Sequence, residues 1–280
     1  TPYDNPDTDG IDPIAVTISL GNGTLLGTVT IAAGSPASFN VDQNALVDIT
    51  ELNSPLSNKG LIIEAPELIY TSLRVQSSSS NHSGYLTAKG DDALGTRFRV
   101  GFSELNNTID NHNFFSSFMA VEDNTIITVS DYETDVIFEP NITDDVLTIT
   151  LNAGESYTLS GYSGASTPGN DDGFIGALIT SQDDAHPIVV TTGNINANDP
   201  SIGQGGSDIL IDQIVQERLV GEEYMLVRGN GSDALERILV IATEANTDVS
   251  INGNFLFTLA NPGDFEFIRD NDLFLPNIIG

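Results

Sequence analysis

The stretch LNAGESYTLSG at residues 151–161 places a glycine turn between two short runs of alternating apolar and polar residues. Similar stretches occur at residues 31–41 (IAAGSPASFNV) and 259–268 (LANPGDFEFI). Alternation with a period of two is typical of a β-strand that buries one face. Gly154 and Gly263 would supply a turn conformation that a Cβ atom opposes. The recurrence of this turn predicts a chain of repeated β units.

Short strands are predicted along most of the chain, because Val, Ile, Thr and Tyr alternate with polar residues between turn-forming Gly, Asn, Asp and Pro. The predicted strands span residues 14–20, 25–31, 125–130, 146–151, 156–161, 176–181, 187–193, 223–229, 237–243 and 247–253. The best helical pattern is SDILIDQIVQERL at 207–219, where Ile211, Ile214 and Leu219 fall on one face. We therefore expect an all-β fold with at most one or two short helices.

Two further pairs of segments indicate internal repetition. AVEDNTIITVS (120–130) matches IATEANTDVSI (241–251), and LGTRFRVGF (94–102) matches VGEEYMLVRG (220–229). Modules of about 100 residues with a strand every 8–12 residues have the size of an antiparallel β-sandwich. A β-propeller is the alternative, although its blades repeat every 40–50 residues or so. The predicted division is an acidic amino-terminal segment (1–13), a first β module (14–115), a second β module (116–235) and the start of a truncated third (236–280).

Composition excludes several functions. Forty Asp and Glu face nine Lys and Arg, which gives a net charge of −31. Nucleic acid is not an expected partner, because phosphate binding needs clustered basic residues. Membrane insertion is not expected either, since no apolar run approaches the roughly 18 residues of a span. The absence of Cys excludes disulfides, thiolate zinc sites and cysteine nucleophiles.

The search for catalytic residues gives no site. His82, His112 and His186 lie in loops or at a strand start, without metal-ligand spacing. No GxSxG elbow and no phosphate-binding loop in a βαβ context occurs. A glycosidase needs only two carboxylates, so a carbohydrate-active hydrolase stays as a less favoured alternative. The chain has no Trp for a sugar platform, and we predict that it is not an enzyme.

One acidic stretch has the spacing of a calcium loop. In DNPDTDGIDP (4–13), Asp7, Asp9 and Asp12 could offer oxygen ligands to Ca²⁺, and a glycine allows the bend between them. If Asn5 is the first position of the loop, the twelfth is Val16 rather than Glu, which excludes a complete EF-hand. The alternative, which we favour, is a solvated amino-terminal segment that binds no metal.

Long blocks of the sequence resemble a known group of proteins. NHSGYLTAKGDDALGTRFRVGF (81–102), DGFIGALITSQDDAHPIVVTTG (172–193) and residues 208–253 resemble the amino-terminal region of large Bacteroidota surface proteins, which often end in a gliding-motility-associated sorting domain and leave by type IX secretion. More distantly, the same blocks resemble the amino-terminal domain of the IgGFc-binding protein family. The resemblance implies an extracellular, cell-surface, β-rich adhesin-type module and, as one partner, the type IX secretion machinery. It carries no catalytic residues.

The sequence thus predicts an extracellular adhesin-type binding module of a larger secreted protein, with surface glycans or proteins as partners. The alternative is a structural segment of a surface filament or stalk. In that case the modules would stack end to end and the partners would be copies of the chain itself.

Overall fold

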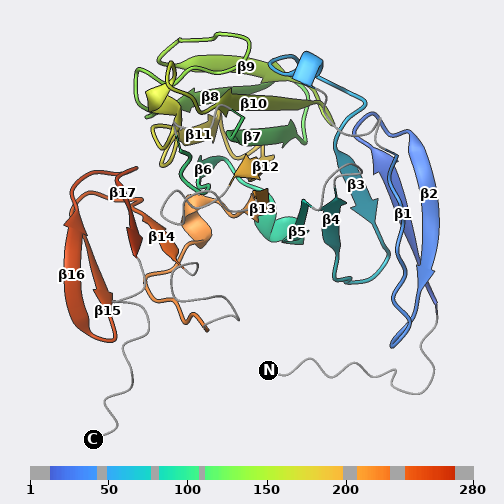
Figure 1. Cartoon of the computed structure of the whole chain (residues 1–280). Helices are drawn as coiled ribbons and strands as arrows, with labels where there is room; N and C mark the ends of the chain where they lie inside the picture. The colour runs from blue at the N-terminus through green and yellow to red at the C-terminus, as the bar shows by residue number, and fades with distance from the viewer. Residues whose placement is uncertain are drawn as a thin grey trace, which may run out of the picture.

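The computed structural model describes residues 13–42, 49–76, 82–106, 111–197, 207–227 and 237–268. Antiparallel strands dominate, and the described part of the chain contains no α-helix, only short 3₁₀ helices (Figure 1). The prediction of an all-β fold of sandwich-like modules is confirmed. The strands are β1 (Ile14–Leu20), β2 (Leu25–Ile31), β3 (Leu61–Glu64), β4 (Ser72–Gln76), β5 (Ser83–Thr87), β6 (Arg97–Arg99), β7 (Asn113–Ala120), β8 (Thr125–Ser130), β9 (Leu147–Leu151), β10 (Ser156–Tyr162), β11 (Leu178–Ser181), β12 (Ile188–Ala197), β13 (Asp208–Ile214), β14 (Ile238–Ile241), β15 (Thr247–Ile251), β16 (Asn254–Leu259) and β17 (Phe265–Ile268).

The centre of the molecule is a sandwich of two four-stranded sheets. One sheet has the order β10-β7-β12-β13 and the other the order β6-β11-β8-β9. Apolar side chains from both sheets form one core, because alternate residues of each strand point inward. Four phenylalanines from different segments pack ring against ring at its centre: Phe102, Phe114, Phe138 and Phe174.

Smaller sheets flank the sandwich on two sides (Figure 1). The amino-terminal side has a sheet of order β2-β1-β3 and the hairpin β4-β5. The carboxyl-terminal side has the pairs β14-β17 and β15-β16. Leu239, Ile241, Phe265 and Phe267 of this last group pack against the sandwich core, so the carboxyl-terminal strands extend the central hydrophobic layer.

The repeated turn predicted from the sequence is present. The Gly154 N–H donates to the Ala120 carbonyl at 2.8 Å, and the Gly263 N–H donates to the Ala242 carbonyl at the same distance. Both glycines have positive φ, 75° and 90°, which side chains with a Cβ rarely adopt. Each turn follows a strand pair, β8-β9 or β15-β16, and leads into β10 or β17.

The order of the elements repeats as well. β3, β4 and β5 are followed by the 3₁₀ helix η3 (Gly90–Ala93), and β11, β12 and β13 are followed by the 3₁₀ helix η6 (Glu217–Leu219). β1-β2, β8-β9 and β15-β16 are the corresponding antiparallel pairs. The predicted boundary between residues 115 and 116 falls within β7, and the division into modules at residues 13, 115 and 235 stays a prediction.

Two predictions of secondary structure were wrong. The segment 207–219 is not a helix, because β13 pairs antiparallel with β12, and only Glu217–Leu219 form a 3₁₀ turn. The residues 223–227 form no strand and lie in irregular backbone, while 228 and 229 lie outside the described residues. The other predicted strands are all present, with shifts of a few residues at their ends.

Candidate functional site

An open pocket of about 270 Å³ lies where the sandwich meets the amino-terminal hairpin. Its walls come from β5, from the segment that follows β6, from the middle of β12 and from β13. The lining combines apolar side chains with amide, hydroxyl and carboxylate groups: Tyr85, Gly101, Phe102, Ser103, Thr192, Gly193, Asn194, Ile209, Leu210, Ile211 and Asp212.

An irregularity in β12 shapes the pocket floor. The pairing of β12 shifts register after Gly193 on the β7 side and after Asn194 on the β13 side. A Cβ at Gly193 would lie 1.9 Å from the Leu210 carbonyl oxygen, so the close approach of β12 and β13 requires glycine at this position. Bulges of this kind commonly redirect side chains next to functional sites.

The fully buried side chain of Asn194 holds this floor in place. Its Nδ2 donates to the carbonyl oxygens of Ser103 and Asn113, both at 3.0 Å, and its Oδ1 accepts the Ser103 N–H at 3.0 Å. The amide thus ties the segment after β6 to β7 and β12, which gives the pocket fixed walls before any ligand binds. A preformed site of this kind loses less conformational entropy on binding.

One exposed tyrosine lines the pocket, and a second lies beside it. Tyr85 is 58% exposed although it lines the pocket. Tyr70, which precedes β4, is 78% exposed. The Tyr70 hydroxyl lies 3.0 Å from the Thr87 hydroxyl. Hydrogen bonds from the side chains of Ser72 and Thr87 lower the pKa of Tyr85. Tyrosines held in this way offer a rigid apolar ring with a polar end, which is typical of protein-binding surfaces.

The one carboxylate in the pocket wall is paired. Asp212 accepts a hydrogen bond from the Lys89 ammonium at 2.5 Å, and the Lys89 N–H donates to the Gln213 side chain at 2.7 Å. The pocket therefore has neither two opposed carboxylates nor a nucleophile beside a base among its lining residues. Its volume is below the roughly 300–1,000 Å³ of small-molecule sites, and it is better suited to a single side chain of a macromolecular partner.

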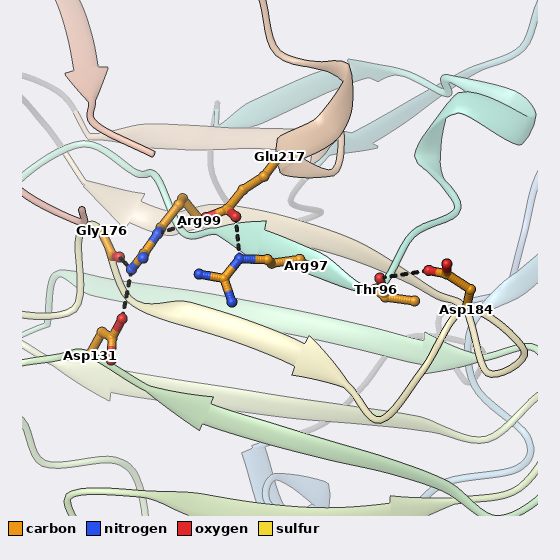
Figure 2. A network of polar contacts seen from close by, with 7 residues as sticks. All are labelled: Thr96, Arg97, Arg99, Asp131, Gly176, Asp184 and Glu217. Carbon is orange, nitrogen blue, oxygen red and sulfur yellow. Dashed lines mark hydrogen bonds and ion pairs between the residues drawn. The ribbon is translucent and has the colours of Figure 1, made fainter. Parts of the chain in front are cut away.

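The main charged network near the sandwich is structural (Figure 2). The buried Arg99 donates from Nε to Glu217 at 2.9 Å and from Nη1 to Asp131 at 3.0 Å and to the Gly176 carbonyl at 2.9 Å. Arg97 donates to the other oxygen of Glu217. These contacts join β6 to the end of β8, the start of β11 and η6, so their role is to fix the sandwich edge.

The carboxyl-terminal strands are fixed by a second arginine. Arg237 donates to Glu104 at 2.8 Å and to the Ser103 hydroxyl at 2.7 Å, and its guanidinium lies 4.4 Å from the centre of the Phe267 ring. Arg237 thus pairs with an acid from the segment that follows β6. Because Ser103 also lines the pocket, this contact connects the pocket wall to β14 and β17.

Of the candidate residues named from the sequence, those that the structure describes do not line the pocket. Asp7, Asp9 and Asp12 lie outside the described residues, so calcium binding there stays a prediction. His112 is buried with Nε2 at 3.0 Å from the Ser207 hydroxyl, and burial lowers its pKa. His186 contacts Asp183 at 2.6 Å. Over the ranges that the structure describes, no group of three or more His, Asp or Glu could hold a metal ion.

The pocket was not identified from the sequence. Its floor depends on where β12 changes register relative to two neighbours, and its walls come from segments about a hundred residues apart in the chain. The one available signal was the Gly193-Asn194 pair at the end of an apolar run, since glycine in a strand often marks a bulge or a close backbone approach.

Fold and site together define an all-β protein of antiparallel sheets with a preformed pocket and an exposed tyrosine in its wall, an arrangement compatible with a binding protein. A family model for the IgGFc-binding proteins matches residues 84–276, which is more than half of the chain. The chain therefore belongs to the IgGFc-binding protein family, whose members are typically extracellular. The whole pocket lies within the matched residues.

The remaining comparisons add no relative. Neither the curated proteins nor the solved structures contain a match to this chain. The family match carries no information on a Bacteroidota origin or on type IX secretion. No helix in the described ranges is long and apolar enough to cross a membrane.

Proposed function

We propose that this chain is a non-catalytic, extracellular module that binds a protein partner through the pocket and its tyrosine rim. The observation that supports this most is the combination of a small, rigid pocket with the exposed ring of Tyr85. Protein interfaces concentrate their binding energy in a few aromatic side chains around desolvated pockets. The adhesin-type role at a cell surface is the finer part of the proposal, and it rests on the resemblance of residues 81–253 to surface proteins.

The charge of the chain favours a basic partner. With a net charge of −31, the field around the module repels acidic surfaces and accelerates encounter with positively charged ones. The name of the family makes the Fc fragment of immunoglobulin G the first protein to test. A glycan ligand is the second candidate from the sequence.

The experiment compares binding of the Fc fragment and of a Fab control to the immobilised chain. We expect saturable Fc binding that Tyr85→Ala weakens about tenfold, because loss of an interface hot spot costs at least ~1–2 kcal/mol. Phe255→Ala is the matched control, since Phe255 is comparably exposed on β16, away from the pocket. Equal effects of the two variants, or saturable binding of glycans without binding of protein, would contradict the proposal.

A structural role in a stack of modules is the second candidate. It is favoured by the close contact between successive units, where the Gly154 turn meets Gly21 and the Gly263 turn meets Gly176. In this alternative the partner is another copy of the chain.

A further inference from the structure

His112 is buried at one end of the sheet β10-β7-β12-β13. It directly precedes β7 and is 1% exposed. Its carbonyl oxygen accepts the N–H of Ser163, directly after β10, at 2.9 Å. Its Nε2 lies 3.0 Å from the hydroxyl of Ser207, directly before β13. Because β12 lies between β7 and β13 in the sheet, this side-chain contact joins two strands that are not neighbours.

The residue after His112 holds the irregular part of β12. The Oδ1 of Asn113 accepts the N–H groups of Ile195 and Asn196 at 3.2 Å and 3.0 Å. The carbonyl oxygen of Asn113 accepts a hydrogen bond from the side chain of Asn194, which lines the pocket. A movement of the backbone at His112 would therefore reach the pocket floor through one neighbouring residue.

β13 supplies a wall of the pocket and begins directly after Ser207. Residues 209–212 of this strand all line the pocket. β13 stands at the end of its sheet order and pairs with β12 there. Local opening begins at peripheral elements with few contacts rather than in the core. The contact between Ser207 and His112 therefore helps to hold this wall in place at its amino-terminal end.

The buried position suits a neutral imidazole and disfavours an imidazolium. In the neutral ring one nitrogen donates and the other accepts, whereas both nitrogens of the protonated ring donate. Over the described residues, the buried Nδ1 of His112 has no hydrogen-bond partner. A proton there would add a donor without an acceptor to a buried charge. Burial accordingly lowers the pKa of His112 below its ordinary value of 6.5.

The charged and titratable groups on the surrounding elements do not compensate such a charge. In the described ranges, the Asp171 carboxylate accepts the Ser163 hydroxyl and the Asp208 carboxylate accepts the Ser83 N–H. Burial raises the pKa of Tyr162, the last residue of β10, so that its hydroxyl stays neutral. Protonation therefore has to move the imidazole toward water.

We propose that His112 is an acid-sensitive release for the pocket: when the imidazole takes up a proton it leaves its buried position, the contact with Ser207 breaks, β13 separates from the sheet at this end, and the bound partner dissociates. Only the last step rests on the proposed function, because the opening of β13 needs no ligand.

The direction of the response follows from proton linkage. A histidine whose pKa is lowered in the closed state binds fewer protons there than in the open state. Its contribution to the closed state is therefore complete above pH 6.5 and is lost as the pH falls from 6.5 toward the lowered pKa. At pH 5.5, one unit below the ordinary value, the population of the open state rises up to about tenfold.

The test is hydrogen exchange of the full chain between pH 7.5 and pH 5.5, read by mass spectrometry in peptides that cover β13. The unchanged chain is compared with His112→Gln at each pH, because glutamine keeps a polar group toward Ser207 but takes up no proton. We expect exchange in β13 of the unchanged chain, relative to the variant, to rise up to about tenfold in acid. Peptides that cover β8 and β9 should show no such difference.

Two further variants provide the controls. His82→Gln should keep the acid response, although His82 directly precedes Ser83, whose N–H donates to Asp208 on β13. Ser207→Ala removes the contact without changing the imidazole, so exchange in β13 should already be faster at pH 7.5. The inference is overturned by an acid response of equal size in His112→Gln, or by unchanged exchange at pH 7.5 in Ser207→Ala.

Binding of the Fc fragment at the two pH values separates this inference from the proposed function. Weaker binding at pH 5.5 in the unchanged chain, but not in His112→Gln, supports release of the partner. Equal pH dependence of binding in the two chains would overturn the release. Absence of Fc binding at both pH values would count against the proposed function alone, since the exchange measurement decides the opening of β13 without a ligand.

Discussion

Gly154 and Gly21 meet backbone to backbone where the repeated turn before β10 contacts the turn after β1. A Cβ at Gly154 would lie 1.9 Å from the Gly21 carbonyl oxygen, and a Cβ at Gly21 would lie 2.0 Å from the Gly154 carbonyl oxygen. Gly176 and Gly263 form a similar contact between the segment before β11 and the turn before β17, with 1.9 Å between a Cβ at Gly176 and the Gly263 carbonyl oxygen. At both contacts, the two segments thus touch at glycines, which have no side chain.

Gly154→Ala should destabilise the protein through both conformation and contact. The residue has a φ of 75°, which costs an alanine about 1–2 kcal/mol, and the clash with Gly21 adds to this. Gly23→Ala is the control, because Gly23 has a φ of 80° and no atom within 4 Å of its Cβ position. Thermal unfolding should show a clearly larger loss for Gly154→Ala, without a change in ligand affinity. Equal losses would mean that the contact between the units contributes nothing.

Arg99→Met should destabilise the sandwich far more than Arg97→Met. Arg99 is 5% exposed in its side chain and donates to Glu217, Asp131 and Gly176, whereas Arg97 is 48% exposed. Removing one partner of a buried ion pair costs about 3–5 kcal/mol, and an exposed pair contributes about 0–1 kcal/mol. Urea unfolding of the two variants measures the difference. Similar midpoints would show that burial of Arg99 has no energetic consequence.

Asp172→Asn should raise the melting temperature at neutral pH. Burial, followed by repulsion from Glu104, Asp171 and Asp135, raises the pKa of Asp172 above its ordinary value of 3.8. A carboxyl whose pKa is raised in the folded state binds more protons there than in the unfolded chain. Its favourable contribution is complete below pH 3.8 and is lost as the pH rises through the folded pKa. The gain from Asp172→Asn should therefore vanish in acid.

Asp183→Asn should change the melting temperature in the opposite direction. The hydrogen bond with His186 lowers the pKa of Asp183, so its contribution is present above pH 3.8 and is lost as the pH falls through the folded pKa. This variant should lower the melting temperature at neutral pH and have no effect in strong acid. Melting curves from pH 2 to pH 7 for both variants test the two signs together, and a gain for Asp183→Asn at neutral pH would contradict the assignment.

Calcium binding by the amino-terminal segment is tested by thermal unfolding with Ca²⁺, with Mg²⁺ and with chelator. A ligand that binds only the folded chain raises its free energy of unfolding by RT ln(1 + [L]/Kd). If Asp7, Asp9 and Asp12 form the site, Ca²⁺ should raise the melting temperature more than Mg²⁺ does, and Asp9→Asn should remove the difference. Equal curves in all three solutions would leave these residues as a solvated acidic segment.

Much of the fold could be predicted because the deciding signals are local. β8 and β15 share Asn-Thr followed by alternating apolar residues, and Gly154 and Gly263 mark equivalent turns. The helix predicted at 207–219 failed for a physical reason. Ile209, Ile211 and Ile214 are β-branched, which favours a strand over a helix, and antiparallel pairing with β12 gives the segment a partner strand that lies outside its own sequence pattern.

The candidate site could not be predicted because it depends on non-local geometry. The pocket forms where β12 shifts its register, and two amide hydrogen bonds of Asn194 then hold the segment of Ser103 against it, while a third reaches the Asn113 carbonyl on β7. The segment 223–227 is a case in which the sequence pattern predicted a strand that the structure does not contain. Its alternating pattern is that of a strand, but a strand also needs a neighbouring strand to pair with. None of the described strands pairs with this segment.

The glycine contacts also determine how the protein responds to a pulling force. The central sandwich has a continuous apolar core, whereas the flanking sheets meet it through backbone turns and a small number of buried side chains, and no disulfide crosses either junction because the chain has no cysteine. Under tension applied at its ends, the molecule should therefore yield at its two junctions first, lengthening in steps while the sandwich stays intact and the pocket loses the wall that β5 supplies.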